Sequence, residues 1–116
     1  MTHSEDPSLR THFLRGALEL LVLQALRAGP RHGYGILEWL EERLGPDLPI
    51  EEGTLYPALH RMKQRGWLQA EWGVSETNRR ARYYTLAKAG RERLEHESAQ
   101  WSSYARTVMG ALETEA

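Results

Sequence analysis

The segment EEGTLYPALHRMKQRGWL, residues 51–68, is the feature that most constrains what this chain can fold into. Its apolar residues Leu55, Leu59 and Met62 recur at spacings of four and three residues, which predicts one buried stripe on a helix. The remaining faces carry side chains that suit contact with a nucleic acid: Thr54, Tyr56, His60, Arg61 and Gln64. We interpret the segment as a DNA recognition helix, the alternative being an ordinary helix of a small helical protein.

The two ends of this helix are predicted from its proline and its glycine. Pro57 lacks an N–H and is tolerated only where the backbone N–H has no helical partner, so we expect Thr54 to be the N-cap and Pro57 to lie in the first turn. Gly66 is expected to end the helix in the left-handed conformation that glycine adopts easily.

Two helices are predicted before this segment. Helical periodicity runs from Leu9 to Ala28 with an apolar surface wider than one stripe, which indicates burial on more than one side. A second helix opens at HGYG, residues 32–35, and a turn rich in glycine and proline, residues 45–49, leads to the recognition helix. Two helices joined by a short turn of this kind are typical of a helix-turn-helix.

A β-hairpin is predicted after Gly66. Residues 67–72 and 81–86 alternate between apolar and polar, and the loop between them contains Gly73, Ser75 and Asn78 as turn formers. A hairpin that follows a recognition helix is the wing of a winged helix. Arg79, Arg80 and Arg82 are then placed to meet phosphates or to enter a minor groove.

The charges of the chain are segregated, although the formal net charge is only −1. Residues 54–93 contain nine Lys or Arg and three acids, a net charge of +6, whereas the remainder carries six Lys or Arg and thirteen acids, a net charge of −7. A basic region opposite an acidic one is expected if a single face meets DNA. An ordinary solvated charge run explains the helix charges better than it explains the arginine cluster.

Residues 88–112 predict one long final helix. Leu94, Trp101 and Val108 are seven residues apart, and an apolar seam is completed by Ala105 and Leu112. We expect this seam to be a dimerisation surface, with packing against the first helix of the same subunit as the alternative.

Catalysis and membrane insertion find little support in the residues. The five histidines lack metal-ligand spacing, cysteine is absent, and no pairing of a nucleophile with a base is recognisable, so we expect no enzyme, no metal and no cofactor. The longest apolar run, residues 18–26, is too short to span a bilayer, and no secretion signal is recognisable. We therefore expect no membrane partner and a cytoplasmic location.

Several ordered motifs together resemble the PadR-like family of bacterial transcriptional regulators. They are LLVLQAL at 20–26, HGYGI at 32–36, EGTLYPALHRM at 52–62 with GWL at 66–68, and RRARYYTLAKAG at 79–90. The resemblance implies a homodimeric winged helix-turn-helix protein, mainly α with a small β-hairpin, that represses transcription from a palindromic operator in double-stranded DNA. It places Thr54, Tyr56, Pro57 and Arg61 in the recognition helix. It further places Tyr34 near the phosphates and Arg80 and Arg82 in the wing.

The resemblance also implies a ligand site. Some of the smaller members of the family bind flat aromatic compounds between subunits against a tryptophan of the last helix, and Trp101 falls at that position, with Leu18, Val22 and Tyr104 as lining residues. The alternative for Trp101 is a buried residue of the dimer seam. The alternative for the whole protein is a winged helix that binds another protein and no effector, although such a wing would not require the arginine cluster.

These expectations divide the chain into an N-terminal arm (1–8), a winged helix-turn-helix domain (9–86), a dimerisation helix (87–112) and a tail (113–116). Two residues depart from the family pattern at helix starts, Glu51 and Ala87, where a capping hydroxyl or amide is usual. The loss of a cap costs about 0.5–2 kcal/mol, which the fold tolerates.

Overall fold

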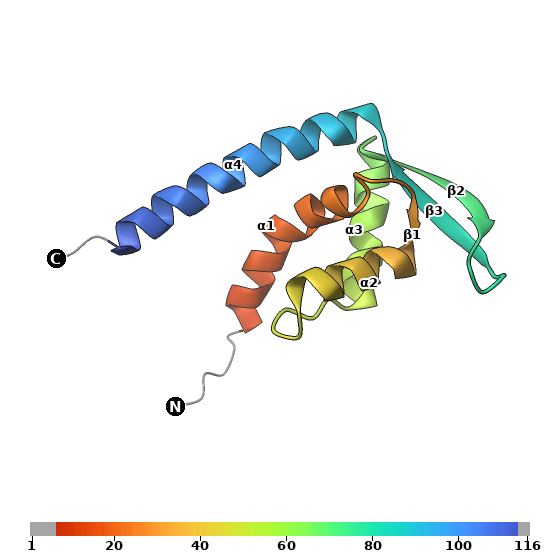
Figure 1. Cartoon of the computed structure of the whole chain (residues 1–116), viewed down its shortest axis with the longest axis horizontal. Helices are drawn as coiled ribbons and strands as arrows, with labels where there is room; N and C mark the ends of the chain where they lie inside the picture. The colour runs from red at the N-terminus through yellow and green to blue at the C-terminus, as the bar shows by residue number, and fades with distance from the viewer. Residues whose placement is uncertain (1–6, 114–116) are drawn as a thin grey trace.

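The chain folds into four helices and a three-stranded antiparallel sheet, as the computed structural model shows for residues 7–113, with side chains described from residue 16 onward (Figure 1). The elements are α1 (Pro7–Ala25), β1 (Arg31–His32), α2 (Gly33–Leu44), α3 (Glu52–Gln64), β2 (Leu68–Val74), β3 (Arg80–Leu86) and α4 (Lys88–Glu113). The predicted class, mainly α with a hairpin and a long last helix, is confirmed. Residues 1–6 of the expected arm and 114–116 of the expected tail lie outside the described residues.

The core lies between α1, α2 and α3, with the sheet and the start of α4 closing it. The largest fully buried side chains come from these three helices and from the turn after α1: Val22, Leu23, Leu26, Ile36, Leu40, Leu55, Leu59 and Met62. Leu68 and Tyr84 add the inner face of the sheet, and Leu94 adds α4. The stripe predicted for residues 55–62 is therefore the face by which α3 enters the core.

The helix predicted to reach Ala28 ends three residues earlier. After Ala25 the backbone tightens, because the N–H of Arg27 donates to the Gln24 carbonyl at 3.1 Å and that of Gly29 donates to the Leu26 carbonyl at 3.3 Å. Gly29 then adopts φ +156°, and the chain leaves the helix.

A third strand, β1, was not expected from the sequence. Its two residues pair with β3, Arg31 with Tyr84 and His32 with Tyr83, in the sheet order β1-β3-β2. Two residues are too few for an alternating pattern. The strand nevertheless anchors the start of α2 to the root of the hairpin (Figure 1).

The end of α3 forms a Schellman motif, which confirms Gly66 as the helix stop. Gly66 adopts φ +80°, its N–H donates to the Lys63 carbonyl at 3.0 Å, and the N–H of Trp67 donates to the Met62 carbonyl at 3.0 Å. The chain passes directly from this turn into β2.

The start of α4 rests on the same turn. The N–H of Ala87 donates to the Trp67 carbonyl at 3.0 Å, and the Ala87 carbonyl accepts from Arg91 at 3.0 Å as the first bond of the helix. Gly90 is buried, and a Cβ there would overlap the carbonyl oxygen of Trp67. A close approach of two backbones thus joins α4 to the end of α3.

We predict that Gly90→Ala lowers the free energy of unfolding by about 1–3 kcal/mol, because the added methyl has no room and the α4 backbone must move. Gly110→Ala is the matched control in the same helix, since a Cβ there meets no atom within 4 Å. It should leave stability unchanged or raise it by up to about 1 kcal/mol. Urea unfolding of both variants at equal protein concentration measures the difference. Equal stabilities for the two variants would contradict the prediction.

Candidate nucleic-acid interface

Every predicted recognition-helix residue lies on the exposed side of α3. The helix buries Leu55, Ala58, Leu59 and Met62 against the core. All six predicted residues are exposed, namely Thr54, Tyr56, Pro57, His60, Arg61 and Gln64. The two sets occupy opposite faces, so α3 is held by one face and presents the other.

The first turn of α3 differs from the expectation, and the assignment of Thr54 as N-cap is wrong. The N-cap is Glu51, whose side chain makes no capping bond and whose carbonyl accepts from the N–H groups of Thr54 and Leu55, both at 3.0 Å. Pro57 consequently lies one turn deeper, where it leaves the Gly53 carbonyl without a helical donor. Gly53 is exposed, so solvent can satisfy that carbonyl.

Arg61 is less free than the other exposed residues of α3. Its Nε lies 3.6 Å from a carboxylate oxygen of Glu19 in α1, and the same carboxylate pairs with Arg65 Nη1 at 3.2 Å. Both arginine side chains are about half exposed, so these pairs are weak enough to exchange for a stronger partner. A base contact by Arg61 would have to replace its ion pair with Glu19.

The wing carries its arginines on the sheet face that faces the helices. Antiparallel pairing sets Leu68 opposite Leu86, Ala70 opposite Tyr84, and Trp72 opposite Arg82. Near the core this face is apolar, and toward the loop of the hairpin it carries Trp72, Arg82 and Arg80. The Arg80 and Arg82 guanidinium carbons lie 4.1 and 5.7 Å from the centre of one Trp72 ring.

Arg79 lies in the loop between the two strands. The Ser75 N–H donates to the Arg79 carbonyl at 2.8 Å, and Asn78 takes φ +60°, a conformation that asparagine tolerates. The loop is closed by backbone bonds, and the side chain of Arg79 is exposed.

A cleft with a volume of about 610 Å³ separates the wing from the starts of α2 and α3. It brings together five of the ten predicted DNA-binding residues, namely Tyr34, Tyr56, Arg79, Arg80 and Arg82. The other five lie on α3. The cleft and the exposed face of α3 are contiguous through Tyr56, and we call the two together the basic face.

Tyr56 is positioned by a close approach to Gly33 at the start of α2. A Cβ at Gly33 would lie 2.6 Å from Cε1 and 2.8 Å from Oη of the tyrosine ring, so only glycine leaves room for the ring. Burial, with smaller contributions from Glu52 and Tyr84, raises the pKa of Tyr56. The phenol therefore keeps its proton at neutral pH and can donate a hydrogen bond to an anion.

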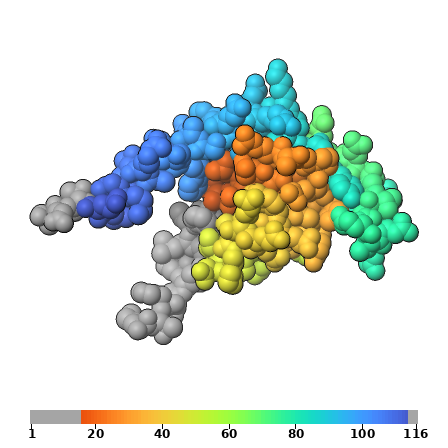
Figure 2. All heavy atoms as spheres, in the orientation of Figure 1, coloured from red at the N-terminus to blue at the C-terminus, as the bar shows by residue number. Residues whose placement is uncertain are grey.

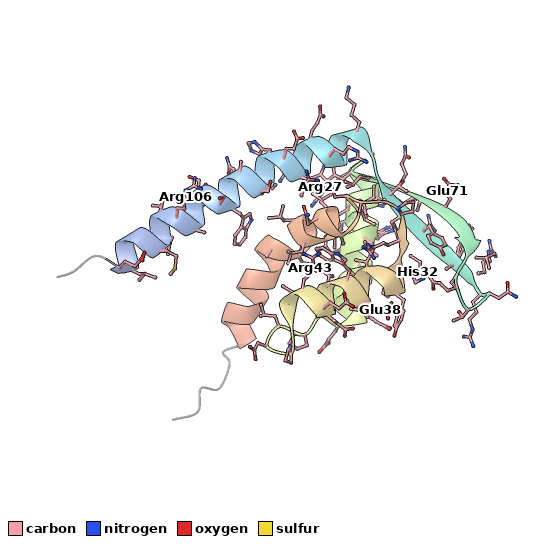
Figure 3. All side chains as sticks on the ribbon, in the orientation of Figure 1. Arg27, His32, Glu38, Arg43, Glu71 and Arg106 are labelled. Atoms are coloured by element: carbon pink, nitrogen blue, oxygen red, sulfur yellow. The ribbon has the colours of Figure 1, made fainter. Side chains whose placement is uncertain are left out.

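His32 holds the wing loop to the start of α2 (Figure 3). Its Nδ1 accepts the Gly35 N–H at 2.9 Å as the N-cap of α2, and its Nε2 lies 3.4 Å from a Glu76 carboxylate oxygen in the loop. The ring also meets Tyr83 edge-on at a centroid distance of 5.3 Å. The N–H of Glu76 itself, and then the bond from His32, lower the pKa of the Glu76 carboxyl.

The residues predicted to line a ligand site are not equally accessible. Leu18 is buried and Val22 has no exposed surface, so within this subunit both belong to the core. Trp101 is half-buried over α1, where a Cβ at Gly16 would lie 3.4 Å from its ring, and Tyr104 is exposed. Only Trp101 and Tyr104 offer surface to a ligand.

In the part of the chain that the structure describes, no group of three or more His, Cys, Asp or Glu side chains could hold a metal ion. No helix among those residues is long and apolar enough to cross a bilayer.

Comparison with known proteins decides the family. Residues 22–96 match the Transcriptional regulator PadR-like family. The chain belongs to the PadR-like family. A transcriptional regulator of Mycobacterium tuberculosis is 33% identical over 99 residues, which cover 84% of this chain and 88% of that protein. The negative transcriptional regulator PadR of Bacillus subtilis is 27% identical over 77 residues, or 66% of this chain and 42% of the other.

Solved structures of PadR-like proteins share the fold. A PadR family transcriptional regulator from Eggerthella lenta is 33% identical, with a TM-score of 0.78 over 94% of this chain and 93% of that one. A PadR-like regulator from Bacillus cereus is 26% identical, with a TM-score of 0.80 over 90% and 99%. This PadR-like protein is therefore a transcriptional regulator with a winged-helix fold, and not an enzyme.

Proposed function

We propose that this PadR-like protein is a cytoplasmic repressor that binds a palindromic operator in double-stranded DNA as a homodimer. The observation that carries the proposal is the basic face, in which the exposed side of α3 adjoins a cleft edged by the wing arginines. Phosphate contacts position such a domain, and contacts to base edges specify its sequence. Tyr34, Arg79, Arg80 and Arg82 suit the first task.

The second task falls to α3. Thr54, His60 and Gln64 are exposed, carry hydrogen-bonding groups, and have no partner side chain to displace among the described residues. Arg61 can make a bidentate contact to guanine once it leaves Glu19. Repression is the mode named for the Bacillus subtilis relative.

We predict that Arg82→Ala weakens binding to every duplex and flattens its salt dependence. Each lost phosphate contact reduces the slope of log K against log salt by about 0.9, hence by about 1.8 for a dimer. Arg106→Ala on α4 is the control, because it removes the same charge far from the basic face (Figure 3). Fluorescence anisotropy with the DNA upstream of the protein's own gene and with an unrelated duplex, each at several salt concentrations, measures both slopes. An Arg82→Ala slope equal to that of the wild type would refute this role of the wing.

The homodimer is proposed from the last three turns of α4. Tyr104, Val108, Met109 and Leu112 are each more than half exposed and follow, on the same side of the helix, the residues Leu94 and Trp101 that face α1. These turns project beyond the body of the subunit (Figure 2). The first half of α4 thus packs within its own subunit, and the second half offers an apolar stripe of the kind that a second copy covers.

We predict that Val108→Glu dissociates the dimer, because it places an unpaired charge in the buried stripe. Ser103→Glu, on the opposite side of α4, adds the same charge and should leave the dimer intact. Sedimentation equilibrium of both variants over a range of concentrations tests this. A dimeric Val108→Glu variant, or a wild-type monomer, would rule out dimerisation through this stripe.

Ligand sensing is proposed at Trp101. This half-buried indole lies where the packed half of α4 meets the exposed stripe, so a second copy would cover its solvent-accessible surface together with Tyr104. An indole face bounded by apolar side chains suits a flat aromatic compound.

We predict that a planar aromatic compound quenches tryptophan emission in the wild type and in Trp39→Phe, but not in Trp101→Ala. Trp39→Phe controls for background emission, since Trp39 lies under Arg43 on α2. Sedimentation must show that Trp101→Ala is still a dimer. Quenching that persists in a dimeric Trp101→Ala variant would mean that Trp101 belongs only to the seam.

A further inference from the structure

Trp72 is an aromatic side chain that neither the core nor the stripe on α4 explains. Its side chain lies on the inner face of the hairpin, but 57% of its surface is exposed, because the core ends at Tyr84 and Trp72 lies beyond it. An indole left in solvent gains little from burial. Its contacts with the wing arginines therefore indicate its role.

Both wing arginines stack on this one ring. Arg82 is directly opposite Trp72 in the strand register, and Arg80 is its diagonal neighbour. Their guanidinium carbons lie 5.7 and 4.1 Å from the ring centre, within the range of a cation–π contact. Two like charges thus contact one indole ring.

Within the described residues, these guanidinium groups make no hydrogen bond or ion pair to another side chain. Among residues 16–113, no carboxylate lies within 4.0 Å of either arginine. A stacked guanidinium keeps its N–H groups in the plane parallel to the ring, where they can meet two oxygens of one phosphate. The guanidinium groups of Arg80 and Arg82 therefore contact the Trp72 ring, and their N–H groups remain available to a phosphate.

Trp67 provides an internal comparison. Arg65 and Arg93 also stack on its ring, at 5.1 and 4.8 Å. Arg65, however, pairs with Glu19 at 3.2 Å, and Arg93 pairs with Glu97 at 2.7 Å. The arginines of Trp67 are each paired with a carboxylate of the same subunit, whereas those of Trp72 remain available to an external anion.

We propose that Trp72 is a positioning residue of the wing, which holds Arg80 and Arg82 in the conformation that contacts DNA phosphates. The inference rests on the proposed function and names the group that prepares its phosphate contacts. A free arginine side chain loses about 2 kcal/mol of rotamer entropy when it is fixed. Stacking on the indole removes part of that loss before DNA arrives, which is preorganisation.

The test compares Trp72→Leu with Trp72→Phe in anisotropy titrations against both duplexes. Trp72→Leu removes the aromatic face and should weaken binding to both duplexes roughly tenfold, since each exposed cation–π contact contributes about 0.5–1 kcal/mol. Trp72→Phe keeps an aromatic face and should retain most of the affinity. Trp39→Leu makes the same change on α2 and should leave the affinity unchanged.

A double-mutant cycle separates positioning from direct contact and from general stability. In the Arg80→Ala/Arg82→Ala background, Trp72→Leu should cause no further loss, because no arginine remains to be positioned. An equal loss in both backgrounds would mean that the indole contacts DNA itself or merely supports the hairpin, and would overturn the proposal. So would full affinity in Trp72→Leu, or a Trp72→Phe variant as weak as Trp72→Leu with an unchanged melting temperature.

The outcomes also separate this inference from the proposed function. A wild-type protein that binds neither duplex at low salt overturns both. A wild type that binds with the predicted sensitivity to Arg82→Ala, but with full affinity in Trp72→Leu, leaves the repressor in place and removes only the positioning role.

Discussion

The backbone of Trp67 is the point on which the remaining structure depends. Its N–H bonds to the Met62 carbonyl and so ends α3, and its own carbonyl accepts the Ala87 N–H and lies against Gly90. One residue thereby joins α3, the start of β2 and the start of α4. Because each contact is made by backbone atoms, the angles between these elements are set by steric limits and not by adaptable side chains.

The wing has a second attachment at its other end. His32 caps α2 through Nδ1 and reaches Glu76 in the wing loop through Nε2, while β1 pairs with β3 beside it. Glu76 is an acid in a basic loop; it pairs with His32 at 3.4 Å and lines the same cleft as the wing arginines. The cleft thus has one wall, the hairpin, that is held at its root by Trp67 and near its tip by His32.

The sequence predicted those features that repeat or that rest on a residue with unusual backbone geometry. The buried stripe of α3, the hairpin and the long last helix follow from periodicity, and the stop at Gly66 follows from glycine chemistry. Features made by pairing distant segments were not predictable in this way. The strand β1 has two residues and no pattern of its own, and the ion pair between Arg61 and Glu19 joins helices that are far apart in the chain.

The start of α3 was predicted wrongly from the position of its proline. Pro57 suggested a later start for α3, but the helix begins at Glu52, with Glu51 as its N-cap, because burial of Leu55 against the core outweighs one missing hydrogen bond at an exposed carbonyl. Trp72 was overlooked for a different reason. Its significance lies in what faces it across the hairpin, and that partner follows only from the exact pairing register.

The same geometry explains how a change in the position of α4 can alter DNA binding. Two recognition helices that enter successive major grooves must lie about 34–36 Å apart. A dimer therefore binds a palindrome only when its two α4 helices hold the recognition helices at that spacing. In the proposed dimer, α4 sets the spacing, and the backbone contact at Gly90 carries any tilt of α4 directly to the end of α3. A ligand enclosed at Trp101 would change DNA affinity only if it bound two arrangements of the α4 helices with different affinities. The backbone contacts at Trp67 would then transmit the change in α4 to α3, without a chain of side chains.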